Sequence, residues 1–256
     1  MNVGRTVGGA PDAGPMDPEV GAVVEQLRLR LDALPARSAY RRTFLEVYLR
    51  TTEAVGRAVA AGGFEDPAWV RRWDVTFAGL FLAAHDADES GGEVPRPWRL
   101  AFAADPGLPP LVHVLVELNA HVNWDLPQAV LAVVSDEDLA SEAVVASRLR
   151  DHDRINAVLA GRTVAEGRLL NGGLGGTLML PVNTWLTHRF LPRARQEAWH
   201  NVLALADGRR EGPDAYAARL RDLDTLASAK VTELLQPRWA LPRVTLRGFG
   251  VTVPPA

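Results

Sequence analysis

Residues 109–127 read PPLVHVLVELNAHVNWDLP, and this stretch decides the class of fold. Two prolines open it, a dense apolar run follows, and Leu126-Pro127 closes it. Apolar side chains occupy nearly every face of the helix predicted over 111–124, so that helix must lie in the interior with other helices around it. Because proline disrupts a helix, we expect a kink or an interruption at Leu126-Pro127 before the helix resumes to Val134.

Helix start and stop signals recur on both sides of this stretch. Asp17-Pro18 and Asp66-Pro67 each place a capping acid before a proline that suits the first helical turn. Apolar residues at spacings of three and four follow each signal. Helices are predicted over 18–34, 38–61, 67–85, 98–103, 111–134, 135–159, 177–206 and 213–235, with a short one after a capping box at Thr163. Strands do not alternate with helices, so the predicted fold class is all-α, a single-domain bundle of eight or nine helices.

The two ends of the chain differ from this helical centre. Residues 1–16 are rich in Gly and Pro and are expected to form a disordered tail. The all-α domain is expected over 17–240. Residues 241–256 are expected to form an extended tail that packs across the surface.

Composition narrows the classes of partner. The 28 basic and 31 acidic residues give a net charge of −3, which argues against a nucleic-acid partner. The absence of cysteine excludes disulfides, thiolate metal sites and a cysteine nucleophile. No apolar run reaches the length of a membrane span, and a cytoplasmic location is the expectation. The oligomeric state is left open.

Four ionisable residues recur at every fourth position of the central helix: His113, Glu117, His121 and Asp125. Side chains at this spacing lie on one slowly drifting stripe. In so apolar a helix they are costly unless they are paired with each other or bound to a metal ion.

His121 and Asp125 are the centre of the predicted site. At a spacing of four they can share one proton or bind one metal ion. Asn119 and Asn123 add a second polar pair on the same helix and are candidate binding residues, as are His113 and Glu117.

The next helix carries a second polar group, His152, Asp153 and Asn156. If the two helices are antiparallel neighbours, these side chains can face His121 and Asp125. Two histidines with carboxylates suit a divalent metal ion, with Zn, Mn, Fe and Mg in that order.

Several functions fit these residues. In an enzyme acting on a small molecule, of hydrolase or lyase type, His121 would be the base or a ligand, Asp125 would orient it, and Asp153 or His152 would complete the site. A non-enzymatic binding or scaffold protein would instead use an aromatic pocket, with the polar network structural. A third alternative is a metal-free cyclase of specialised metabolism with an aromatic cavity. The aromatic candidates are Trp73, Phe77, Phe81, Trp124, Trp185 and Trp199.

Residues 119–127, Asn-Ala-His-Val-Asn-Trp-Asp-Leu-Pro, resemble the Asn-Ala-His-Ile-Asn-x-Asp-Leu signature of an uncharacterised family frequent in actinobacteria. Further segments resemble the same family in order along the chain: 44–52 with Val55, 63–69, 74–78, 153–156 and 195–199. The resemblance implies a mainly helical single domain and implies no activity. Glu117 stands where the family has a small residue, so His113 and Glu117 are interpreted as additions of this member, as is His85.

Overall fold

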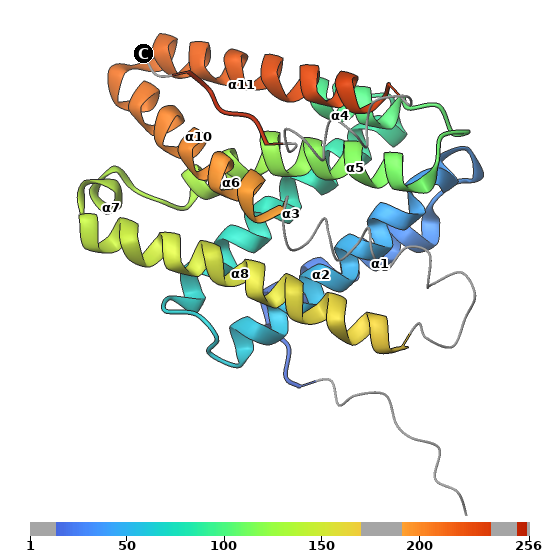
Figure 1. The fold of residues 1–256 in the computed structure, drawn as a ribbon, viewed down its shortest axis with the longest axis horizontal. Coiled ribbons are helices and arrows are strands. Elements are labelled where there is room, and N and C mark those ends of the chain that lie inside the picture. The colour runs from blue at the N-terminus through green and yellow to red at the C-terminus, as the bar shows by residue number, and fades with distance from the viewer. Residues whose placement is uncertain (1–13, 170–190, 237–249, 255–256) are drawn as a thin grey trace, which may run out of the picture.

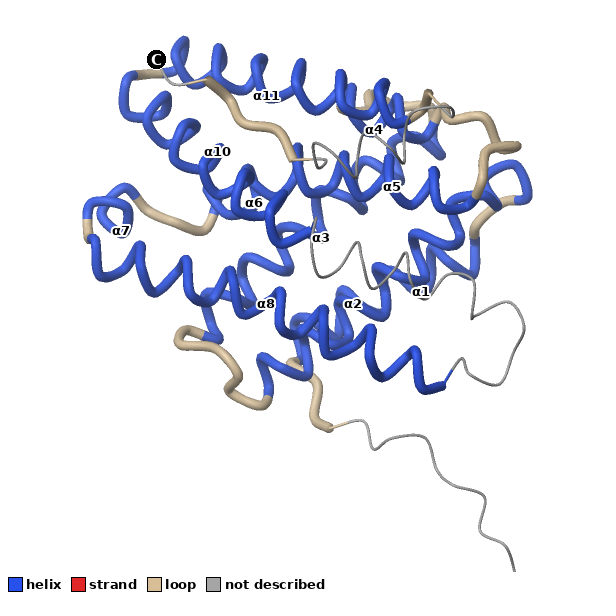
Figure 2. Tube along the Cα trace, viewed as in Figure 1, coloured by secondary structure: helices blue, strands red, loops and turns tan. Residues whose placement is uncertain are grey.

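The computed structural model describes residues 14–169, 191–236 and 250–254, with side chains omitted for 161–169. Within these residues every regular element is helical (Figure 2), which confirms the predicted all-α class. The α-helices are α1 (Pro18–Ala33), α2 (Arg42–Ala60), α3 (Pro67–Ser90), α4 (Arg96–Phe102), α5 (Pro110–Ala120), α6 (Leu126–Ala132), α7 (Asp136–Ala140), α8 (Glu142–Leu169), α10 (Leu191–Glu211) and α11 (Pro213–Leu234). A 3-10 helix, η1 (Ala36–Arg41), precedes α2, and a π-helical turn, η2 (His121–Asp125), joins α5 to α6.

The segment α5–η2–α6 runs through the middle of the molecule (Figure 1). Helices α10 and α11 cover one side of it, whereas α1, α2, α3 and α8 lie on the other. This arrangement follows from the sequence of the central segment, because its apolar side chains point in all directions and need partners on all sides. Val116, Ala120 and Leu126 are all fully buried.

The predicted capping signals form as expected. The Asp17 carboxylate accepts the backbone N–H groups of Glu19 and Val20, and Asp66 accepts that of Trp69. Ser135 and Asp138 make the reciprocal bonds of a capping box at the start of α7.

Some predicted boundaries were wrong. The helix predicted over 135–159 is two helices, since Ser141 adopts an extended conformation between α7 and α8. The box at Thr163 does not start a new helix, because α8 continues to Leu169. Helix α3 continues past His85 until Gly91, which has the positive φ of 73° that ends a helix favourably. Residues 177–190 of the predicted 177–206 helix lie outside the described residues.

The last described residues of the chain, 250–254, belong to no helix and are bonded to α10 and η2. Asn201 of α10 donates to the carbonyl of Val251 at 2.8 Å and accepts the N–H of Val253 at 2.8 Å. Asn123 of η2 accepts the N–H of Val251 at 3.1 Å. These bonds hold the segment 250–254 against α10 (Figure 1).

Candidate functional site

The signature residues His121–Asp125 adopt the π-helical turn η2. The N–H of Leu126 donates to the carbonyl of His121, five residues earlier, as in a π-helix. Pro127 has no N–H and cannot donate to the carbonyl four residues earlier, so the regular α-helical ladder is interrupted here. The interruption predicted at Leu126-Pro127 therefore occurs in the turn just before the proline. Single π-turns within α-helices often mark functional sites.

His121 and Asp125 form the hydrogen-bonded pair that their spacing predicted. Nδ1 of His121 lies 2.9 Å from Oδ2 of Asp125, and both side chains are buried. The indole N–H of Trp98, from α4, donates to the same carboxylate oxygen at 2.9 Å. Asp125 thus fixes the orientation of the imidazole ring and is itself held by Trp98.

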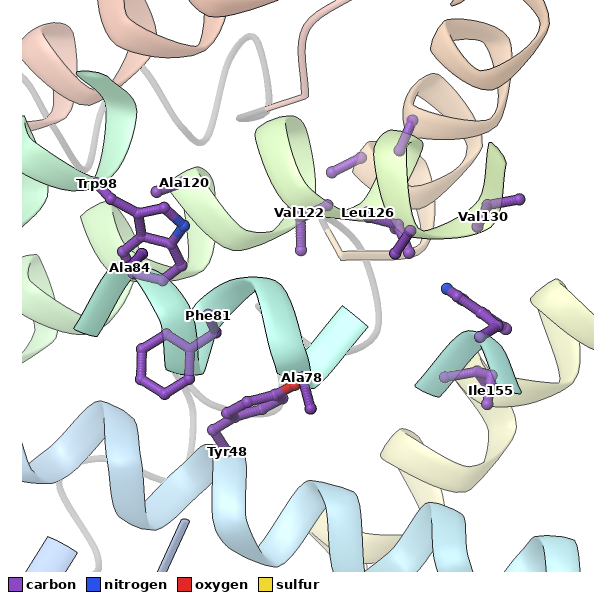
Figure 3. Close-up of a cluster of buried hydrophobic side chains, with 14 of the residues drawn as sticks. Tyr48, Ala78, Phe81, Ala84, Trp98, Ala120, Val122, Leu126, Val130 and Ile155 are labelled. Atoms are coloured by element: carbon purple, nitrogen blue, oxygen red, sulfur yellow. The ribbon is translucent and has the colours of Figure 1, made fainter. Parts of the chain in front are cut away.

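Aromatic rings enclose the imidazole. Phe77 of α3 stacks on it with ring centroids 3.6 Å apart and planes 6° apart, and Tyr48 of α2 meets it edge-on at 4.6 Å. Figure 3 shows Tyr48 beside Phe81 in this buried cluster. These rings cover the imidazole, and the His121–Asp125 pair is shielded from solvent.

Burial shifts both groups toward their uncharged forms. It lowers the pKa of His121 well below its usual value and raises the pKa of Asp125 well above its usual value, the latter shift being opposed by the Trp98 hydrogen bond. With both groups uncharged, the O–H of Asp125 donates to Nδ1, and the neutral imidazole carries its own proton on Nε2. Nε2 is the atom of the pair that is left to exchange a proton with anything else, and it has no hydrogen-bond partner among the described residues.

His121 lies on the wall of a cavity of about 140 Å³ between α2, α3, α5, η2, α8 and α10. Figure 3 shows three of its lining residues, Tyr48, Val122 and Ile155, coming from three different elements. The deep part contains His121, Tyr48 and Trp73, all buried, whereas Val114 and Leu118 are half-buried and lie toward the rim. The described lining residues are Phe44, Val47, Tyr48, Thr51, Thr52, Val55, Trp73, Asp74, Phe77, Val114, Leu118, His121, Val122, Ile155, Leu159, Leu191 and Arg195.

Two further charged side chains lie on the same wall. Arg195 of α10 is 4% exposed, and Asp74 of α3 is half-buried. Burial raises the pKa of Asp74 to about 7, against the opposing charge of Arg195, and lowers the pKa of Arg195 to about 10. Oδ2 of Asp74 and Nε of Arg195 have no hydrogen-bond partner among the described residues. An apolar cavity with a few convergent polar groups is typical of a small-molecule site.

The second predicted group, on α8, lies elsewhere. The His152 ring stacks on Trp73 at 5.4 Å and packs against Trp199 at 5.5 Å, so it contacts the far side of a cavity wall. Burial, followed by the charge of Arg195, lowers its pKa to about 4. Asp153 is exposed and Asn156 is half-buried. Helix α8 does face the cavity, but through Ile155 and Leu159, one turn of helix apart, and neither Asp153 nor Asn156 is among the described lining residues.

His113 and Glu117, the first two residues of the predicted stripe, do not line the cavity with His121. His113 packs against the ring of Tyr40 at 4.7 Å, and neither residue is among those that line the cavity. Glu117 is buried nearby, and burial raises its pKa well above the usual value, with the charge of Arg41 opposing the shift. Each step of four residues turns the stripe by about 40°, and the π-turn displaces it further, so its two halves face different helices.

The candidate binding residues Asn119, Asn123 and Trp124 interact with other parts of the protein. Asn119 is fully buried, and Asn123 accepts the N–H of Val251 from the end of the chain. Trp124 is half-buried, and its carbonyl accepts the side-chain N–H of Gln128. Trp185 of the predicted aromatic pocket lies outside the described residues, whereas Trp73 and Phe77 do line the cavity.

Within the described residues, no three His, Asp or Glu side chains are grouped as metal ligands. Nδ1 of His121 and Oδ2 of Asp125 are bonded to each other, and no third His, Asp or Glu joins the pair in the described part of the chain. No helix of the described part has the length and apolarity that crossing a membrane requires.

Four residues that the tertiary structure brings to the site were not identified from the sequence: Trp98, Tyr48, Asp74 and Arg195. A signal for three of them was present, because Tyr48, Asp74 and Arg195 lie in segments that resemble the family. Trp98 lies outside those segments, and only its contact with Asp125 identifies it.

The comparison with known proteins covers the part of the chain that contains these segments. The family model DUF5995, described as a family of unknown function, matches residues 20–237. The resemblance to an uncharacterised family is thereby confirmed. No curated protein and no solved structure matches the chain.

Proposed function

The chain belongs to this family of unknown function, DUF5995, and from the chemistry of its cavity we propose that it is an enzyme that moves a proton on a small molecule. His121 is the proposed acid–base group, and Asp125 and Trp98 are the groups that position it. The reaction is of hydrolase or lyase type, since in both a base held at a fixed place takes a proton from water or from a C–H bond and can return it to the leaving group.

One observation carries this proposal: Nδ1 of His121 is fixed by Asp125, while Nε2 belongs to a residue on the cavity wall and has no described partner. A buried polar atom without a partner costs stability, so Nε2 of His121 stands to gain from a ligand that enters the cavity. Nε2 is an N–H donor when the Asp125 carboxyl is protonated and donates to Nδ1, and it is a base when the pair has lost one proton and Nδ1–H donates to the Asp125 carboxylate.

The described cavity wall contains the hydroxyl groups of Tyr48, Thr51 and Thr52, and the two threonine hydroxyls bond to the backbone of their own helix. Thr51 and Thr52 donate to the carbonyls of Val47 and Tyr48. They are therefore occupied as helix-internal donors and are not activated by His121. Water, or an acidic C–H bond of the substrate, is the proposed partner of Nε2, and no covalent intermediate with the protein is required.

A non-enzymatic ligand-binding protein is the second candidate, and the mostly apolar wall of the cavity favours it. The variant His121→Asn separates the two. An asparagine amide can keep the hydrogen bond to Asp125, but it lacks the Nε2 position and exchanges no proton at neutral pH.

Wild type and His121→Asn are incubated with a panel of small esters, amides and β-hydroxy carbonyl compounds that have apolar bodies, and products are followed by mass spectrometry. The proposal expects turnover by wild type and a loss of about 10²- to 10⁴-fold in the variant, with ligand binding retained. Binding to both proteins without turnover by wild type would establish a binding protein instead. Unchanged turnover in the variant would exclude His121 as the acid–base group.

A further inference from the structure

Arg195 brings a buried positive charge to the cavity wall, and the N–H groups of its guanidinium are only partly hydrogen-bonded. Nη2 donates to the backbone carbonyl of His152 at 2.8 Å, and the guanidinium lies 5.3 Å from the Trp73 ring centroid. Its Nε–H has no partner among the described residues. A guanidinium has five N–H donors in a fork that matches a carboxylate, so a buried arginine with this geometry is a ready anion site.

The acids near Arg195 do not neutralise it. Asp74 and Asp153 influence its pKa through charge alone, and neither makes an ion pair with it within 4.0 Å in the described part of the chain. Asp153 is exposed to solvent. Because the pKa of Asp74 is about 7 and that of Arg195 about 10, the arginine is charged at neutral pH while Asp74 is ionised in about half of the molecules.

The rest of the wall suits an apolar body. Phe77, Val122 and Ile155 lie around the space that Arg195 borders. A cavity of about 150 Å³ lined by apolar side chains takes a molecule of the size of benzene. The cavity volume of about 140 Å³ therefore matches a group of about one aromatic ring.

We propose that the cavity takes a small monocarboxylate whose apolar body packs against Phe77 and Val122 and whose carboxylate pairs with Arg195, and that Asp74 takes up a proton when this anion binds. This names the substrate class for the site of the proposed function and rests on it. The carboxylate fixes the ligand at one end of the cavity, so that its body reaches the Nε2 atom of His121.

The charged groups around Asp74 determine whether it gains or loses a proton when an anion binds. Asp17 of α1 raises the pKa of Asp74, and Arg195 of α10 lowers it. Tyr48 of α2 stays protonated, its pKa being raised by burial and then by the charge of Asp74, and His121 of η2 is neutral. Helix α6 contains no titratable residue. A second anion beside Arg195 competes with the Asp74 carboxylate, so anion binding favours its protonated form.

The test measures binding alone, without any turnover, so that its failure is distinguishable from failure of the proposed function. The probe is benzoate, which stays ionised between pH 6 and 8 and has one ring. Benzamide and benzylamine are the neutral and cationic controls of the same shape. Calorimetry or quenching of tryptophan fluorescence gives the dissociation constants.

Benzoate is expected to bind at least about tenfold more tightly than either control, as for one charge-assisted pair. Its affinity is expected to fall by up to about tenfold from pH 6 to pH 8, since one proton is taken up on binding. Arg195→Met should abolish the preference for benzoate, whereas Arg193→Met, an exposed arginine on the same helix, should not.

Asp74→Asn keeps the test decisive even if Arg195→Met does not fold. This variant should bind benzoate as tightly at pH 8 as at pH 6. Retention of the full pH dependence in Asp74→Asn would overturn the role of Asp74. Equal binding of benzamide, tighter binding of benzylamine, or no binding of benzoate to folded wild type would overturn the carboxylate class.

Discussion

Trp98 and His121 meet on a single oxygen atom: the indole Nε1 and the imidazole Nδ1 each lie 2.9 Å from Oδ2 of Asp125. The two rings come from different helices and lie 5.9 Å apart between centroids. One buried carboxylate therefore joins α4 to the π-turn and sets the orientation of the imidazole. The stability of this joint can be measured.

Trp98→Phe should lower the free energy of unfolding by about 1–3 kcal/mol more than a matched ring change without a hydrogen bond. Trp69→Phe is that control, because Trp69 is also fully buried and its indole N–H has no partner among the described residues. Both variants leave a similar cavity, so the difference isolates the bond to Asp125. Urea denaturation monitored by circular dichroism gives both values, and equal losses would show that the bond contributes nothing.

Asp74→Asn should stabilise the protein at pH 8 by about 2–4 kcal/mol and have little effect at pH 4. The pKa of Asp74 is about 7 in the folded state and near 4 in the unfolded chain. A raised pKa means that the contribution of Asp74 to stability is fully present below pH 4 and is lost as pH rises through 7. The measurement is the free energy of unfolding at several pH values, and a constant difference between variant and wild type would contradict the expectation.

Glu117→Met should raise the free energy of unfolding by about 1–3 kcal/mol at pH 8, and by less at pH 5. Both carboxyl oxygens of Glu117 are buried without a partner among the described residues, so ionising it is costly. Glu211→Met, at an exposed position, serves as the control and should change stability little. Chemical denaturation at the two pH values decides, and destabilisation at pH 8 would show that Glu117 makes a needed interaction.

Asn201→Ala should destabilise the protein by about 1–3 kcal/mol, because it removes two hydrogen bonds to the segment 250–254. A chain truncated after residue 249 loses the same two bonds. In that truncated chain Asn201→Ala should therefore cost much less, as a double-mutant cycle requires for coupled groups. Additive losses would mean that Asn201 acts through some other contact.

The candidate site was only half predictable from sequence. His121 and Asp125 could be found because four residues apart on a helix is a local geometry, and because a polar pair in so apolar a helix needs a partner. Which way Asp153 and Asn156 point relative to His121 could not be predicted from the sequence. It depends on how α8 rotates about its own axis, which is decided by the packing of Ile155 and Leu159 against other helices.

By itself, the sequence determined the helical class, the starts of α1, α3 and α7, the central place of 110–132 and the pairing of His121 with Asp125. All of these follow from periodicity, capping and spacing, which act within a few residues of one another. Only the tertiary structure decided that Trp98 holds Asp125, that Asp74 and Arg195 share the cavity with His121, and that His113 and Glu117 do not. Those relations join residues up to 121 positions apart. The packing of whole helices sets them, because close-packed side chains fix how each helix is rotated about its axis and how closely it approaches its neighbours.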